Sequence, residues 1–217
     1  AILYDVGMGI AANALAAIER HAFLSAAKKI DFKLKIFSFE NNLTSILAAL
    51  EQKELFPFLG KHQQKLDTLL SQKLYKDSQL EWCLMEGDFF NSCRQIPKAH
   101  VVFYDFFSPK SSPALWSVDC FKSAFDQLQI DIRSKLITYC ASTKVRVALL
   151  LAGFFVGEGV STDTKKQTTV ASLDFTVLKK PLTRAWLEKV ARSSDPVPFN
   201  FSGNVLSSLE KHPQFSV

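Results

Sequence analysis

The stretch Tyr4–Asn13, which reads YDVGMGIAAN, combines residue types that can hold a ligand. An acid, Asp5, and two alternating glycines, Gly7 and Gly9, stand between an apolar run typical of a strand and an alanine-rich run typical of a helix. Glycine lets the backbone turn tightly and lets a ligand come close, and the following helix adds oriented N–H groups. The spacing alone is weak evidence, because a plain strand-to-helix turn can also contain two glycines.

Two further strand-like runs end in acids. Glu40 closes KLKIFSFE, and Gly87 and Asp88 close LEWCLMEGD. A carboxylate at the first position can accept both hydroxyls of a ribose, and an acid at the second can accept an adenine amino group. In parallel sheets, ligands lie at the carboxyl ends of the strands. The three strand ends together predict a site for an adenosine-containing cofactor.

Two such cofactors fit the loop. The run GMGIAA matches the G-x-G-x-x-A form used for NAD, but that fingerprint expects its ribose acid about 20 residues later, and Glu40 lies 31 residues past Gly9. Asp5 would also be unusual in an NAD-binding strand. In methyltransferases an acid at this position is common, where it organises the loop and can meet the methionine ammonium through water. The sequence therefore favours S-adenosyl-L-methionine.

The elements that must position these residues alternate along the chain. Of the 217 residues, 47% are hydrophobic, which suits one α/β domain over 1–217. Strands are predicted at 1–6, 33–40, 80–88, 100–107 and 135–142, with two closing strands in FFVGEG and QTTVASL joined by the loop VSTDTKK. Helices are predicted at 11–29, 42–52, 59–76, 114–128 and 143–153, with short ones in FNSCRQI and in the tail after Pro181. This pattern predicts a Rossmann-like, seven-stranded, mostly parallel sheet with helices on both faces. Because the chain starts without Met inside a strand, we expect further residues before Ala1 in the natural protein.

The stretch YDFFSPKSSPALWS follows the fourth of these strands and carries the residues closest to the expected chemistry. Asp105 ends the strand, beside the expected position of an activated methyl, where an acid can orient and deprotonate an amine. Phe106 and Phe107 can flank a flat substrate, and Lys110 can meet a phosphate. The alternative is that the phenylalanines belong to the core and that Lys110 is simply solvated.

Here the sequence resembles the methyltransferase domain of the MnmC family, the bacterial enzymes of 5-methylaminomethyl-2-thiouridine synthesis in tRNA. The glycine loop of that family, E/D-x-G-x-G-x-G-x-N, is matched by Asp5, Gly7, Gly9 and Asn13, with Ala11 in place of the third glycine. Its signature D-x-F-x-P-x-x-N-P-E-x-W is matched by Asp105, Phe107, Pro109, Pro113 and Trp116. Later runs, including TYCASTKVRVALLLAGFFV, are also similar, so the resemblance spans nearly the whole chain.

The resemblance implies a stand-alone class I methyltransferase that lacks the oxidase half of the bifunctional enzyme. It further implies N-methylation of the aminomethyl group of a wobble 2-thiouridine in tRNA, in the cytoplasm, with a separate FAD-dependent oxidase in the same pathway. The formal charge of +5 is compatible with RNA. The basic residues expected to meet phosphates are Lys110, Lys144, Arg146, Lys165 and Lys166.

Two other functions remain open at this point. One is a methyltransferase of the same fold that acts on a small amine or a protein side chain, and the other is a non-catalytic RNA-binding relative. Neither a membrane segment nor a metal site is expected. Arg146 and several glycines interrupt the longest apolar run, and the four histidines and four cysteines lack metal-binding spacing.

Overall fold

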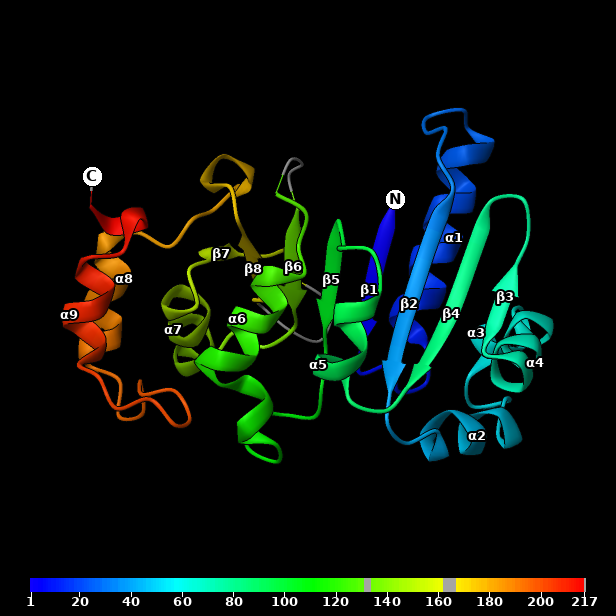
Figure 1. Ribbon diagram of the computed structural model, residues 1–217, viewed down its shortest axis with the longest axis horizontal. Helices are drawn as coiled ribbons and strands as arrows, with labels where there is room; N and C mark the ends of the chain where they lie inside the picture. The colour runs from blue at the N-terminus through cyan, green and yellow to red at the C-terminus, as the bar shows by residue number, and fades with distance from the viewer. Residues whose placement is uncertain (131–133, 162–166, 217) are drawn as a thin grey trace. The chain divides into compact units, whose positions relative to one another are not determined.

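The structure is a computed structural model that describes residues 1–130, 134–161 and 167–216 (Figure 1). By their internal contacts, the residues form two compact units, a first unit of residues 1–105 and a second unit of residues 106–217. The prediction of a single domain stays a prediction.

The first unit contains a five-stranded sheet in the order β3-β4-β2-β1-β5. The strands are β1 (Ile2–Val6), β2 (Leu34–Glu40), β3 (Leu74–Lys76), β4 (Leu80–Glu86) and β5 (Val101–Tyr104). All are parallel except β3, which runs antiparallel to β4. The chain leaves β1 toward β2 on one side and later returns to β5 on the other, so the strand order reverses at β1. In such sheets a ligand binds at that reversal, beyond the carboxyl ends of the strands.

Helices cover both faces of this sheet. They are α1 (Ala12–Ala26), α2 (Thr44–Glu51), α3 (Pro57–Gly60), α4 (Gln63–Gln72), α5 (Phe89–Ser92) and the 3₁₀ turn η1 (Cys93–Gln95). On one face, aliphatic side chains of α1, α2 and α4 pack with Leu3, Ile36 and Leu84 of the strands. On the other, Phe89 of α5 packs edge-on against Tyr4 and Phe39, with ring centroids 6.3 and 4.9 Å apart. Because successive strand residues face opposite sides, Tyr4 and Asp5 lie on different faces.

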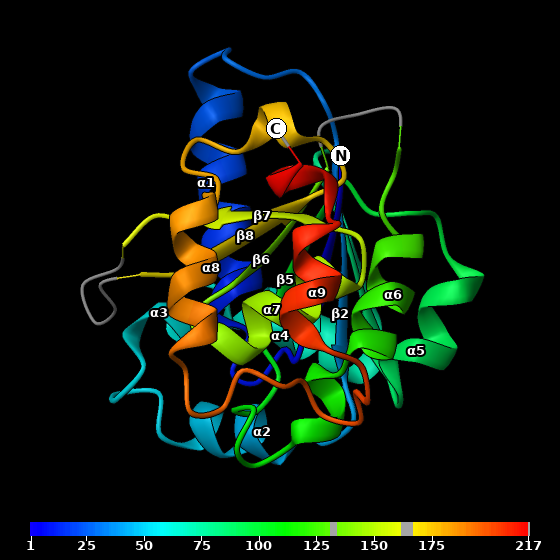
Figure 2. The ribbon, with the colours of Figure 1, turned by 90° about the vertical axis from the view of Figure 1, so that its left-hand side faces the viewer.

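The second unit contains a three-stranded antiparallel sheet in the order β6-β8-β7. Its strands are β6 (Lys135–Thr138), β7 (Phe155–Glu158) and β8 (Thr169–Ser172). Its helices are η2 (Pro113–Trp116), α6 (Val118–Asp126), α7 (Thr143–Leu151), η3 (Phe175–Val177), α8 (Arg184–Ala191), α9 (Val205–Glu210) and η4 (Pro213–Phe215). Figure 2 shows α8 and α9 side by side.

The structure differs from the sequence prediction at β3 and at α9. The described residues form eight strands rather than seven, because the helix predicted to reach Lys76 ends at Gln72 and β3 follows it. Lys73, with φ of 60°, makes the turn between them. Helix α9 was not predicted, because no strong periodicity marks it. The two closing strands are confirmed as β7 and β8, while most of the loop between them, residues 162–166, lies outside the described residues.

Among the described residues, no helix is both long and apolar enough to cross a membrane.

Candidate functional site

The glycine loop between β1 and α1 has an unusual backbone. Gly7, Gly9 and Ala11 all have positive φ, at 81°, 54° and 62°. The N–H groups of Gly7 and Met8 both donate to the carbonyl of Phe39, at 3.0 and 3.1 Å, which ties the loop to β2. The two glycines adopt this backbone without strain, whereas the buried Ala11, at the position of the third family glycine, carries a β-carbon in the left-handed region.

Glu40 holds the same loop from the end of β2. Its Oε2 accepts a hydrogen bond from the Gly9 N–H at 3.0 Å, and its Oε1 accepts from the N–H groups of Asn41 and Asn42. The carboxylate is therefore fixed in place by backbone donors before any ligand binds. A carboxylate can accept about four hydrogen bonds, so the ribose-binding role remains a prediction that this geometry permits.

Gly87 and Asp88 lie at the end of the neighbouring strand, β4. The Gly87 N–H donates to the carbonyl of Glu40 at 3.0 Å, which brings the two strand ends together. Asp88 is exposed, and its Oδ1 caps α5 by accepting from the Asn91 N–H at 3.0 Å. Its predicted contact with adenine is untested.

Asp105 follows β5 at the same edge of the sheet. Its N–H donates to the carbonyl of Val6 at 2.9 Å, and its Oδ2 accepts from Nδ2 of Asn13 at 2.7 Å. Asn13 belongs to the first turn of α1. The sequence predicts Asn13 among the cofactor-binding residues, and the structure shows it in contact with Asp105.

Asp5 is fully buried on the face of the sheet that packs against α1. Its Oδ2 accepts from the Ser38 hydroxyl at 2.8 Å, whereas its Oδ1 has no hydrogen-bond partner among the described residues. Burial raises the pKa of Asp5 to about 7; the Ser38 hydrogen bond opposes this rise, and the nearby Asp105 and Glu40 add to it. Asp5 therefore changes charge near neutral pH.

Two residues of this site were missed by the sequence analysis. Ser38 and Trp82 are both fully buried, and the Trp82 indole N–H donates to the Ser38 hydroxyl oxygen at 2.9 Å. The available signal was a small polar residue, Ser38, between Phe37 and Phe39 in the run KLKIFSFE. Such a residue needs a partner when buried, but the sequence does not show which one.

The signature stretch after Asp105 belongs to the second unit. The Phe106 carbonyl accepts from the Tyr139 hydroxyl at 3.3 Å, and the Phe107 carbonyl accepts from the Trp116 indole N–H at 2.9 Å. The Phe107 side chain is 70% exposed, so it is not a core residue, and Lys110 is also exposed. The signature tryptophan thus holds the backbone of this stretch, while Phe107 and Lys110 face outward.

The expected phosphate-binding residues are only partly available. Arg146 is 1% exposed, and its guanidinium donates to Thr169 Oγ1 and to the Thr168 carbonyl, both at 3.1 Å, so the prediction that it meets phosphate is wrong. A buried, bonded guanidinium supports the fold of the second unit instead. Lys144 pairs with Asp195 at 2.6 Å. Lys165 and Lys166 lie outside the described residues.

Within the described part of the chain, no group of three or more His, Cys, Asp or Glu side chains is placed to hold a metal ion.

Comparison with known proteins decides the family. Residues 51–174 match the family described as S-adenosyl-L-methionine-dependent methyltransferase. The chain belongs to this family. The match confirms the resemblance to the MnmC methyltransferase domain and identifies S-adenosyl-L-methionine as the cofactor of the methyltransferase.

The fold of the methyltransferase is also found in solved structures. MnmC2 from Aquifex aeolicus superposes with a TM-score of 0.70 and 24% identity, over 97% of this chain and 66% of that one. Precorrin-6y C5,15-methyltransferase from Geobacter metallireducens is similar at a TM-score of 0.45 and 14% identity, over 79% of this chain and 78% of that one. The match to the Aquifex structure, together with the family, confirms the class I methyltransferase fold.

A curated relative, the uncharacterized protein MJ0670 of Methanocaldococcus jannaschii, is 35% identical over 74 residues, which are 34% of this chain. The methyltransferase spans a fifth of the length of that relative and slightly less than two thirds of the Aquifex chain.

Proposed function

We propose that the methyltransferase transfers a methyl group to the nitrogen of the 5-aminomethyl group on a wobble 2-thiouridine of tRNA. The observation that carries the catalytic part is the Asn13–Asp105 hydrogen bond, which holds a carboxylate at the edge where β1 and β5 end side by side. The stretch from Asp105 to Trp116 resembles the signature of the MnmC family, and this resemblance supports the choice of 5-aminomethyl-2-thiouridine as the substrate.

The edge of the first unit fits the cofactor. Gly7 and Gly9 open the backbone for a close approach, and the Glu40 carboxylate is already fixed beside them. Asp5 lies fully buried behind the loop, and its Oδ1 has no hydrogen-bond partner among the described residues. In this proposal Glu40 receives the ribose, Gly87 and Asp88 contact the adenine, and Asp5 faces the ammonium of the amino-acid part. When bound, S-adenosyl-L-methionine supplies a sulfonium-activated methyl group.

Asp105 has the chemistry that an amine acceptor needs. A primary amine is mostly protonated at neutral pH, and only the neutral form has a lone pair to attack with. A carboxylate at the strand end can take up or orient that proton, and Asn13 keeps its Oδ2 in a fixed direction. The remaining contribution of the protein is to hold the amine in line with the methyl group.

The second unit supports an RNA acceptor. Residues 106–217 carry fourteen Lys and Arg against nine Asp and Glu, so all of the net charge of +5 lies there. We place Phe106 and Phe107 against the base and Lys110 on a phosphate. In this proposal a separate FAD-dependent oxidase produces the amine, and both enzymes act in the cytoplasm.

The test is mass analysis of tRNA nucleosides from a strain that lacks the gene. We expect the unmethylated 5-aminomethyl-2-thiouridine to accumulate and its methylated form to disappear, and a plasmid copy to restore the parent profile. An unchanged profile would favour a small-amine or protein acceptor, or a relative that binds RNA without catalysis.

A further inference from the structure

The backbone that follows Asp105 is held by two aromatic side chains of the second unit. The Trp116 indole N–H donates to the Phe107 carbonyl at 2.9 Å, and the Tyr139 hydroxyl donates to the Phe106 carbonyl at 3.3 Å. Trp116 is 2% exposed and belongs to η2, whereas Tyr139 directly follows β6. Two successive carbonyls are therefore fixed by separate parts of the fold.

The next residues close into a tight turn. The N–H groups of Ser111 and Ser112 both donate to the Ser108 carbonyl at 3.0 Å, and the hydroxyls of Ser108 and Ser111 form a hydrogen bond of 2.8 Å. Lys110 lies in this turn and is exposed. The backbone of residues 106–112 is thus bonded at both of its ends, and this order costs conformational entropy.

The ring of Phe107 gains little burial in return for that order. It is 70% exposed, although the carbonyl of the same residue is bonded to a buried tryptophan. The bond therefore fixes the position of the residue and does not pack its ring into the core. A ring on a fixed backbone binds a flat partner at a smaller entropy cost than a ring on a mobile loop. The unpaired bases of RNA are flat partners that stack on aromatic side chains.

We propose that Trp116 is a positioning residue for the acceptor: through the Phe107 carbonyl it fixes the backbone that presents the Phe107 ring to the target nucleobase. Tyr139 supports the same backbone one residue earlier. The stacking is assigned to Phe107, because Phe106 is half-buried. This inference rests on the proposed function in one respect, that the acceptor is a base of an RNA.

The role of the Phe107 ring is measured by filter binding of the full chain to tRNA that carries 5-aminomethyl-2-thiouridine. Phe107→Ala should weaken affinity by about 5- to 150-fold, the range found when a base loses its aromatic partner. Phe107→Tyr keeps the ring and should bind like the parent, whereas Phe107→Leu keeps an apolar side chain without a flat ring and should lose most of the affinity. Calorimetry with S-adenosylhomocysteine should give the parent affinity for all three variants. Parent affinity for tRNA in Phe107→Leu would refute the stacking.

The role of Trp116 is measured with Trp116→Phe, which removes the indole N–H and keeps an aromatic ring. Affinity for the tRNA should fall by about three- to tenfold, the scale of one lost hydrogen bond. In the Phe107→Ala background the same change should have no further effect, because Trp116 acts through Phe107. Tyr139→Phe is carried through the same two backgrounds, so the test does not depend on the folding of one variant, and its loss should be smaller because its bond is longer.

Trp186→Phe is the matched control for Trp116→Phe. Trp186 is another buried tryptophan of the second unit, and its indole nitrogen has no hydrogen-bond partner among the described residues. The same substitution there removes an N–H that holds no carbonyl, so affinity for the tRNA should stay at the parent value.

The failures are distinguishable. Equal losses from Trp116→Phe in the parent and in Phe107→Ala would show that Trp116 does not act through the ring, and parent affinity in both Trp116→Phe and Tyr139→Phe would refute the positioning role. In either case the proposed function stands if the parent methylates the tRNA. If the parent binds S-adenosylhomocysteine but neither binds nor methylates this tRNA, the proposed acceptor fails, and this inference fails with it.

Discussion

Residues 1–105 carry twelve basic and twelve acidic side chains, whereas residues 106–217 carry fourteen basic and nine acidic ones. The neutral first unit gathers its acids where ligand chemistry is expected, with Asp5, Glu40 and Asp105 at one edge of a parallel sheet. The basic second unit has no comparable acidic edge among its described strands. This difference suits two ligands of opposite kind, a cationic cofactor for the first unit and a polyanion for the second.

The two units also hold their candidate residues differently. In the first unit the side chains themselves are bonded, as Glu40 is to Gly9 and Asp105 is to Asn13. In the signature stretch of the second unit the hydrogen bonds from Tyr139 and Trp116 go to backbone carbonyls, and the side chains of Phe107 and Lys110 are left exposed. The first unit is thus prepared for one ligand geometry, while the second offers groups that can adapt to a larger partner.

The largest effect is expected at Asp105. Asp105→Asn keeps the size of the side chain but removes its charge and basicity, so single-turnover methylation should fall by about 10²–10⁴-fold. Affinity for the cofactor should stay near that of the parent. Methylation at close to the parent rate would show that Asp105 has no catalytic task, and loss of cofactor binding would assign it to the cofactor pocket.

The second largest effect is expected for Glu40→Ala. Removing this carboxylate leaves the Gly9 N–H without its partner and takes away the ribose acceptor, so cofactor binding should weaken by roughly 1–3 kcal/mol. Calorimetry measures the effect, and Glu86→Ala, at the end of β4, provides a control at an exposed acid. Equal losses of cofactor affinity in the two variants would show that Glu40 does not bind the cofactor.

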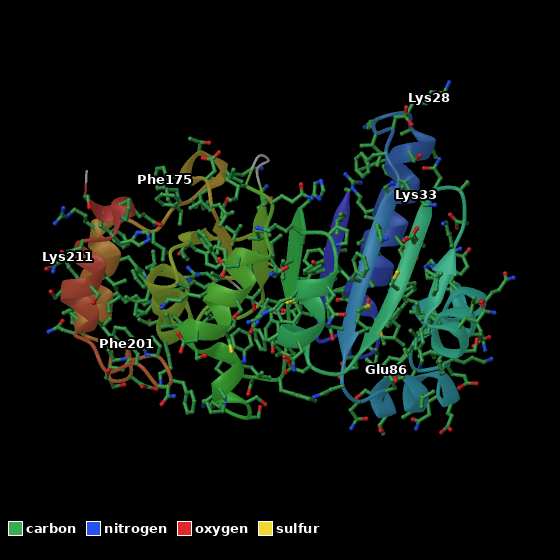
Figure 3. The ribbon with its side chains drawn as sticks, viewed as in Figure 1. Lys28, Lys33, Glu86, Phe175, Phe201 and Lys211 are labelled. Carbon is green, nitrogen blue, oxygen red and sulfur yellow. The ribbon has the colours of Figure 1, made fainter. Side chains whose placement is uncertain are left out.

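The contrast in charge can be tested with two exposed lysine pairs. Lys179 and Lys180 lie in the second unit, and Lys28 and Lys29 in the first. Figure 3 shows Lys28 and Lys33 at the end of the first unit opposite Glu86, which marks the carboxyl end of β4. Changing the second-unit pair to Gln should weaken tRNA binding by about three- to tenfold and reduce the salt slope by about one to two.

The same change at Lys28 and Lys29 should alter neither quantity, because the first unit carries no net charge. Filter binding at several salt concentrations measures both pairs. Equal losses of tRNA affinity from the two pairs would contradict the proposal that the second unit binds the RNA.

The smallest effect is expected at Ala11. Ala11→Gly relieves a β-carbon at φ of 62° and should raise the free energy of unfolding by about 0.5–1 kcal/mol. Ala16→Gly, at an exposed position within helix α1, which Ala11 precedes, should lower it by about 1 kcal/mol. Urea denaturation compares the two, and destabilisation by both changes would mean that Ala11 is not strained.

Sequence patterns placed the candidate acids well, because the carboxyl ends of parallel strands meet at one edge wherever the strands begin. They could not show which side chains touch. The bond between Asn13 and Asp105 joins residues 92 positions apart, and that between Trp82 and Ser38 joins residues 44 apart. Both depend on strand register and on the angle of a helix. The burial of Arg146 could not be predicted either, because an arginine in an apolar run can be either a core or a surface residue.

The most direct test supplies the purified chain with isotopically labelled S-adenosyl-L-methionine and tRNA that carries the 5-aminomethyl-2-thiouridine. The account predicts label in that nucleoside as its methylaminomethyl form, with tRNA lacking the amine left unlabelled. Label in a protein or a free amine, or none in tRNA despite bound cofactor, would contradict the account.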